Sequence, residues 1–256
     1  MTNSMEHLRC ESHGDVRLVT FDRPEKKNAM SNEMRSQLCR LLADLDADET
    51  VKAVVLTGTD PAFTAGVDFT DIDPAFKASE AQFSVNPGRA LRAMSTPVLC
   101  AVNGACVSGG LEIALSATFI VASTQARFAD THARLGVVPT WGLTALLPRA
   151  IGVRHARELS ITGNFIDAVT ALQIGLVNHV VAHEDLIPFS LQLAGQIAST
   201  PAVGEILSLY RQGEELSLQG ALSLEATSTA RRPFNAETFA KAGRETVARQ
   251  RAETSE

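Results

Sequence analysis

Short apolar runs alternate with helical patterns over the first half of the chain. Residues 16–21 alternate between apolar and polar side chains as a strand does, and three runs rich in β-branched residues lie at 51–57, 98–102 and 119–122. Ser31 is a suitable helix N-cap, because apolar residues follow it at helical spacing: Met34, Leu38, Leu41, Leu42 and Leu45. Strands that alternate with helices predict an α/β fold of stacked ββα units with mainly parallel pairing.

The second half of the chain is predicted to be mostly helical. Apolar spacing indicates a helix from Pro148 onward, another helix over residues 168–174 and a last short strand over residues 177–181. After Pro201 the pattern is entirely helical. We therefore expect a core over residues 1–200 and a helical region over residues 201–256.

Composition and charge narrow the class of protein. The chain has 256 residues, 45% of them hydrophobic, which is enough for one large core. A net charge of −6 disfavours a nucleic-acid binder, since such a protein needs a basic face. The four cysteines form no CxxC pair, the first residues lack an apolar signal core, and no run reaches the roughly 18 apolar residues of a spanning helix. We expect a reduced, cytoplasmic protein with no membrane partner.

Two glycine-bearing turns each follow an apolar run and precede a helical pattern: FTAGVD at residues 63–68 and NGACVSGGLE at residues 103–112. Helix N-termini leave backbone N–H groups unpaired, so two such turns brought together form a site for a developing oxyanion. Glu112 lies three residues after Gly109, on the same face of the predicted helix, where its carboxylate would stand over the bound oxygen. Tight helix–strand packing would explain the glycines but not Glu112.

Five segments together point to a known family. They are RPEKKNAM at 23–30, AFTAGVD at 62–68, AVNG at 101–104 leading into GGLE at 109–112, ARF at 126–128 leading into LGVVP at 135–139, and GLVNHVV at 175–181. Over nearly its whole length the chain resembles the enoyl-CoA hydratase/isomerase (crotonase) superfamily. The resemblance implies a crotonase (ClpP-like) spiral core and a C-terminal helical region that packs subunits into homotrimers or dimers of trimers. It implies an acyl-CoA thioester substrate and no cofactor beyond the coenzyme A of that substrate.

The resemblance also implies roles for individual residues. The donors to the thioester oxygen fall at the backbone N–H groups of Val67 and Gly109, and the first of the hydratase's two catalytic glutamates falls at Glu112. The position of the second glutamate holds His132 instead. The other positions expected to contact substrate are Lys26, Ala29, Ala65, Asp68 and Trp141.

Glu112 and His132 each allow two interpretations. Glu112 lies on an otherwise apolar helix and is either a buried acid/base or a residue on the polar face; burial raises a carboxylate pKa while a helix N-terminus lowers it. His132 either assists in proton transfer or is a polar residue held by Asp130 or Glu112 that orients a wall of the pocket.

The expected binding residues have structural alternatives too. Lys26 belongs to a basic cluster, with Arg23 and Lys27, that could contact a CoA phosphate or form a solvated loop. Asp68 suits a helix cap better than a catalytic role, and Trp141 could be core or substrate wall. Four apolar residues between the two turns are expected to shape an acyl tunnel: Phe69, Ile72, Phe76 and Phe83.

Hydration of a 2-enoyl-CoA thioester is the predicted reaction, with Glu112 as principal acid/base and His132 assisting. Double-bond isomerisation by one carboxylate is the first alternative, a non-catalytic acyl-CoA-binding protein the second, and a hydrolase using Ser108 the third. Residues 104–110 lack the Lys-Ser/Thr of a P-loop, and the chain has neither GxGxxG nor HExxH, so neither nucleotide hydrolysis nor a catalytic metal is indicated.

Overall fold

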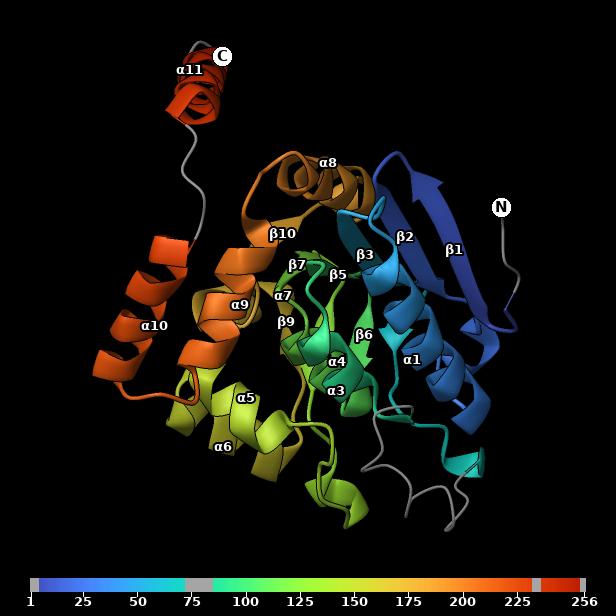
Figure 1. Ribbon diagram of the computed structural model, residues 1–256. Coiled ribbons are helices and arrows are strands. Elements are labelled where there is room, and N and C mark those ends of the chain that lie inside the picture. The colour runs from blue at the N-terminus through green and yellow to red at the C-terminus, as the bar shows by residue number, and fades with distance from the viewer. Residues whose placement is uncertain (1–4, 72–84, 232–235, 254–256) are drawn as a thin grey trace. The chain divides into compact units, whose positions relative to one another are not determined.

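The computed structural model describes residues 5–71, 85–231 and 236–253 (Figure 1). The chain forms two compact units, Met1–Gly204 and Glu205–Glu256. The first unit holds both β-sheets, and the second is helical. Within the described ranges, no helix has the length and apolar character needed to cross a membrane.

A six-stranded sheet forms the centre of the first unit. Its strands, in spatial order, are β1 (Leu8–His13), β2 (Val16–Phe21), β3 (Ala53–Gly58), β5 (Val98–Val102), β7 (Phe119–Ser123) and β10 (His179–Val181). Strands β1 and β2 form an antiparallel hairpin, and every later pairing is parallel. All residues of β3 and β5 are buried, as expected for parallel strands covered on both faces.

A second, four-stranded sheet brings distant parts of the chain together. It comprises β4 (Ala62–Thr64), β6 (Ala105–Val107), β8 (Arg127–Ala129) and β9 (Ile166–Asp167). Strands β4, β6 and β8 are parallel, so the segments that follow them leave the sheet at one edge. Those segments contain the FTAGVD turn, the SGGLE turn and His132.

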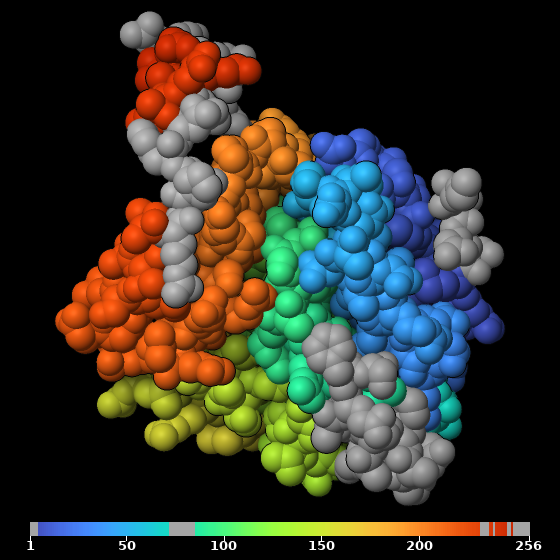
Figure 2. All heavy atoms as spheres, in the orientation of Figure 1, coloured from blue at the N-terminus to red at the C-terminus, as the bar shows by residue number. Residues whose placement is uncertain are grey.

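The helices of the first unit cover both faces of the large sheet. They are α1 (Asn32–Ala47), α3 (Pro87–Ala93), α4 (Gly109–Ser116), α5 (Leu143–Ile151), α6 (Val153–Thr162), α7 (Ala168–Gln173) and α8 (Leu186–Ala198), with short 3-10 turns η1 (Pro24–Lys26), η2 (Phe69–Asp71), η4 (Ala133–Leu135) and η5 (His183–Asp185). Helix α8 packs on one face with its own apolar cluster, and the larger core lies on the other. Helices α1 and α3 contact each other, and Figure 2 shows the surface of this part of the molecule.

The second unit contains α10 (Leu218–Arg231), α11 (Ala236–Glu253) and most of α9 (Val203–Gly213). Several large apolar side chains of these helices are exposed: Ile206, Tyr210, Leu218, Leu222 and Phe239.

The structure confirms most of the predicted elements and corrects one. Strand β2 and strand β5 have the predicted bounds, and the Ser31 side chain caps α1 by accepting from the Met34 N–H. The helix expected from Pro148 onward is present, but its start and continuity are wrong: α5 begins at Leu143, Pro148 lies inside it, and Gly152 at φ +77° separates it from α6. Proline removes one helical hydrogen bond, but the buried apolar face of α5 outweighs that loss.

Candidate active site

The two glycine turns meet because β4 and β6 are parallel neighbours. Thr64 pairs with Cys106 in that ladder, and the chain then turns at the same edge from both strands. A Cβ built on Gly66 would lie 3.1 Å from the Gly109 nitrogen and 2.9 Å from the Val107 carbonyl oxygen. This close approach and a φ of +92° require glycine at position 66.

Two backbone N–H groups at this junction, those of Val67 and Gly109, have no hydrogen-bond acceptor in the described part of the chain. The N–H of the next residue, Asp68, is bonded to the Met30 carbonyl oxygen at 3.0 Å. Gly109 begins α4, where the first N–H groups lack partners within the helix and carry partial positive charge. An acyl oxygen between the turns could accept from both groups, as an oxyanion site requires.

Ser108 ties the second turn to the segment after β8. Its φ of +48° and ψ of −104° are unusual for an L-residue, and three contacts hold it there. Its N–H donates to the Ala129 carbonyl at 2.9 Å, its hydroxyl accepts from the Thr131 N–H at 2.9 Å, and the two hydroxyl oxygens are 2.7 Å apart. The described residues place no histidine on the Ser108 hydroxyl, so the serine-hydrolase alternative gains no support.

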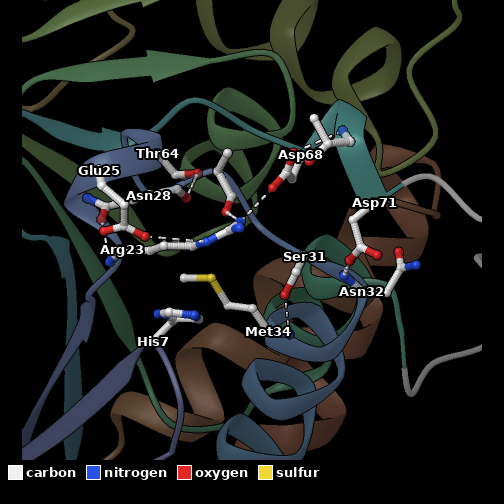
Figure 3. Close-up of polar contacts among 12 residues, drawn as sticks. His7, Arg23, Glu25, Asn28, Ser31, Asn32, Met34, Thr64, Asp68 and Asp71 are labelled. Carbon is white, nitrogen blue, oxygen red and sulfur yellow. Dashed lines mark hydrogen bonds and ion pairs between the residues drawn. The ribbon is translucent and has the colours of Figure 1, made fainter.

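The loop over residues 23–30 lies against the first turn and fixes its backbone (Figure 3). Ala65 N–H donates to the Lys27 carbonyl at 3.0 Å, and Met30 N–H donates to the Gly66 carbonyl at 2.7 Å. The Thr64 hydroxyl donates to the carbonyl of Asn28 at 2.7 Å. These bonds hold the N–H of Ala65 and the carbonyl of Gly66 beside the loop. Because the Gly66 carbonyl and the Val67 N–H belong to one peptide group, the loop also sets the orientation of the Val67 N–H.

A largely buried ion pair is a further link between the same loop and the end of the first turn. Arg23 Nη1 lies 2.6 Å from Asp68 Oδ2 and 3.0 Å from the Ala29 carbonyl oxygen (Figure 3). Burial alone would raise the pKa of Asp68, but hydrogen bonds from Thr70 and Arg23, with the Arg23 charge, lower it to about 2. Asp68 therefore caps the 3-10 turn η2 and pairs with Arg23, and the Arg23 guanidinium is not free to meet a CoA phosphate as the sequence suggested.

Arg23→Met is expected to lower the free energy of unfolding at pH 7 by about 2 kcal/mol, because it leaves the Asp68 carboxylate buried without its partner. A carboxylate whose folded pKa is depressed stabilises the fold above its unfolded pKa of about 3.9, so this difference should shrink between about pH 4 and pH 2. Urea denaturation at several pH values measures it. Arg40→Met is the control, since its pair with Glu33 is mostly exposed and worth about 0.5 kcal/mol. Equal losses in both variants would contradict the assignment.

Glu112 is buried on α4, with only 2% of its surface exposed, so the exposed interpretation is wrong. Its Oε1 accepts hydrogen bonds from the backbone N–H groups of Trp141 at 2.7 Å and Leu143 at 3.3 Å. Burial raises the pKa of Glu112, and these N–H groups and the neighbouring His132 oppose the rise without cancelling it. A carboxyl held this way can carry a proton closer to neutral pH than an exposed one.

His132 lies between two carboxyl groups. Its Nε2 is 3.7 Å from Glu112 Oε2, and its Nδ1 is 2.5 Å from Asp130 Oδ1. Both carboxyl side chains are almost fully buried, whereas 13% of the His132 side chain is exposed. The acid/base pair expected from the sequence is therefore together in space, and Asp130 is the partner that holds the ring.

Trp141 is fully buried and packs against the second glycine turn. A Cβ built on Gly109 would lie 2.9 Å from Cζ3 of its ring, and its carbonyl oxygen accepts from Arg92 Nη1 at 2.6 Å. The Arg35 guanidinium lies 5.6 Å from the ring centroid. Since the Trp141 backbone N–H also donates to Glu112, this residue connects the second glycine turn to the Glu112 carboxyl group.

The remaining predicted contacts lie in the 23–30 loop, in the first turn itself and just after that turn. Lys26 is exposed on the 23–30 loop, and Ala29 and Ala65 are half-buried. Phe69 is 60% exposed just after Asp68. The other residues expected to shape an acyl tunnel, Ile72, Phe76 and Phe83, lie outside the described residues.

Sequence reasoning gave no role to the Arg23–Asp68 pair or to the Ser108–Thr131 contact. Both link segments more than 20 residues apart, so no local spacing reveals them. A signal for the Asp130–His132 contact is present in the sequence. An aspartate two residues before another residue often accepts that residue's backbone N–H, as Asp130 does from His132 at 3.2 Å.

Comparison with known proteins agrees with this architecture. The enoyl-CoA hydratase/isomerase family matches residues 11–249. A probable peroxisomal enoyl-CoA hydratase of Arabidopsis thaliana is 35% identical, covering 88% of this chain and 85% of that protein. A 1,2-epoxyphenylacetyl-CoA isomerase of Escherichia coli K12 is 34% identical, with 86% and 88% covered. The crystal structure of an enoyl-CoA hydratase from Mycobacterium smegmatis superposes with a TM-score of 0.73 at 40% identity, covering 88% of this chain and 96% of the other.

The chain therefore belongs to the enoyl-CoA hydratase/isomerase family, and its fold is the crotonase fold expected from the sequence.

Proposed function

We propose that this protein is an enoyl-CoA hydratase, a lyase that reversibly adds water to the double bond of a 2-enoyl-CoA thioester. The observation that carries the proposal is a buried Glu112, 3.7 Å from His132 and three residues after Gly109 on the helix that begins at the oxyanion turn. Similarity to named enoyl-CoA hydratases over most of the chain supports the same reaction.

The paired amides account for stabilisation of the enolate. As water adds to the β-carbon, negative charge moves onto the thioester oxygen, where the N–H groups of Val67 and Gly109 would donate hydrogen bonds. Fixed donors stabilise this charge more than the ground-state carbonyl, and each is typically worth about 3 kcal/mol of barrier.

The two proton transfers of hydration account for the pairing of Glu112 with His132. Hydration requires one group to take a proton from water and another to deliver a proton to the α-carbon. Glu112 and His132 can divide these two transfers. When the pair together holds one proton, the member that carries it can act as the acid and the other member as the base. Burial of Glu112 raises its pKa and so favours the protonated form that can deliver a proton.

Double-bond isomerisation is a second candidate. Hydratases of the family place a second glutamate where this chain has His132, and a single carboxyl group can move a proton between two carbons of one enolate. The similarity to an isomerase of Escherichia coli favours this alternative further. The same oxyanion site would serve either reaction.

Incubation of the protein with crotonyl-CoA and with a 3-enoyl-CoA in heavy water separates the candidates. A hydratase is expected to convert crotonyl-CoA to a 3-hydroxyacyl-CoA with one deuterium at the α-carbon and loss of thioester conjugation. Conversion of the 3-enoyl-CoA to the conjugated isomer, with no product carrying added oxygen, would favour isomerisation. Tight binding with neither product would leave an acyl-CoA-binding protein without turnover.

The proposed function also includes the substrate contacts, the subunit assembly and the cellular location. Lys26 would contact a phosphate of CoA, and Ala29, Ala65 and Trp141 would line the bound thioester. The helices of the second unit would join subunits into a homotrimer or a dimer of trimers, for which their exposed apolar side chains are suited. The protein would act in the cytoplasm with no cofactor other than the substrate's own coenzyme A.

A further inference from the structure

Asp130, which holds the His132 ring, makes the shortest polar contact of the acid/base cluster. Its Oδ1 lies 2.5 Å from Nδ1 of His132 and also accepts the backbone N–H of that residue at 3.2 Å. Only 1% of its side chain is exposed. A buried carboxylate without such partners would be costly, so the imidazole and the carboxylate stabilise each other.

This contact determines which way the His132 ring presents its nitrogens. An ionised carboxylate only accepts hydrogen bonds, so Nδ1 must carry the proton that joins it to Asp130. The other nitrogen, Nε2, then faces Glu112 Oε2 at 3.7 Å. Burial would raise the pKa of Asp130, but hydrogen bonds from His132 and Ser160 lower it, so Asp130 stays ionised while Glu112 can be protonated.

We propose that Asp130 is the positioning residue of the acid/base pair: it holds His132 in the Nδ1-protonated form with Nε2 directed at Glu112. The inference rests on the proposed function, in which Glu112 and His132 exchange protons with the substrate. With the Asp130 carboxylate on Nδ1, a proton that arrives at Nε2 makes an imidazolium beside an anion, and Nε2 is the nitrogen that returns it.

The anchoring of Asp130 joins this pair to the oxyanion site. Its neighbours in sequence, Ala129 and Thr131, both bond Ser108, the residue before Gly109. On its other side, Ser160 of α6 bonds the carboxylate. Asp130 is thereby fixed to the same frame as the Gly109 amide, which would keep His132 in register with an acyl group bound there.

Asp130→Asn tests the proposal, with Asp167→Asn as the matched control at an exposed cap of α7. Asparagine keeps the size of the side chain but removes the negative charge. We expect kcat for crotonyl-CoA hydration to fall at least about 100-fold with KM changed less than about threefold, because Asp130 does not touch the substrate. The control should keep the activity of the natural protein.

Nitrogen-15 NMR of histidine-labelled protein supplies a readout that loss of structure alone does not give. The natural protein is expected to show a strongly downfield signal from the proton on His132 Nδ1. The signal is assigned to His132 by its absence in His132→Gln, and Asp130→Asn should lose it as well. If Asp130→Asn does not fold, Ser160→Ala should still fold, shift the same signal and lower kcat about tenfold.

The outcomes separate this proposal from the proposed function. A kcat within threefold of the natural protein in folded Asp130→Asn, or no downfield Nδ1 proton in the natural protein, would overturn the role of Asp130 and leave hydration intact. If the natural protein turns over no enoyl-CoA, the hydratase assignment fails, while the NMR signal still decides whether Asp130 holds His132 as stated.

Discussion

Replacement of Glu112 with glutamine is expected to lower kcat by about 10²- to 10⁴-fold, the range that a positioned acid/base group contributes. Glutamine can still accept the N–H groups of Trp141 and Leu143 through its amide oxygen, so the fold and substrate binding should persist. The thermal midpoint should stay equal or rise, since the variant no longer buries an ionisable carboxyl group.

Steady-state kinetics with crotonyl-CoA and a thermal melt measure both effects. Glu158→Gln, at an exposed position of α6, is the control and should behave as the natural protein does. A Glu112→Gln variant that retains more than a tenth of the natural kcat would show that Glu112 is not the principal acid/base. A large drop in thermal midpoint would instead assign Glu112 a structural role.

Val67→Pro is expected to lower kcat by about 100-fold, equivalent to about 3 kcal/mol, because proline has no N–H to donate to the thioester oxygen. Its matched control is Val67→Ala, which keeps the amide and removes only the half-buried side chain. The alanine variant should stay within about threefold of the natural kcat, so the pair of variants isolates one backbone hydrogen bond.

The carbonyl stretch of a carbon-13-labelled thioester, measured on the bound ligand, checks the same bond independently of rate. It should lie at lower frequency on Val67→Ala than on Val67→Pro, because a hydrogen bond to the oxygen weakens the C=O bond. Equal frequencies with equal kcat would remove Val67 from the oxyanion site.

Much of the fold follows from local patterns in the sequence. The buried parallel strands are β-branched runs, and the N-cap of α1 is readable from Ser31 because a cap acts over three residues. The meeting of the two glycine turns was predicted from their positions after strands, and the parallel pairing of β4 with β6 is the reason it occurs. Burial of Glu112 was one of the two interpretations that its apolar neighbours on α4 allowed, and the structure decides between them.

What the sequence could not predict depends on contacts between distant segments. Arg23 and Asp68 are 45 residues apart, and a basic cluster beside a loop resembles a phosphate site until its partner is known. Helix α5 runs through Pro148 because tertiary packing outweighs the local preference of proline. The direction of the Glu112 pKa shift required its actual burial and its N–H partners, since burial and the helix terminus act in opposite directions.

A crystal structure with a non-hydrolysable enoyl-CoA mimic tests the central claim most directly. The account predicts that the oxygen of the thioester mimic lies about 2.7–3.1 Å from the nitrogens of both Val67 and Gly109, with the α- and β-carbons facing Glu112 and His132. An oxygen beyond hydrogen-bond distance of either amide, or an acyl group bound away from Glu112, would contradict it.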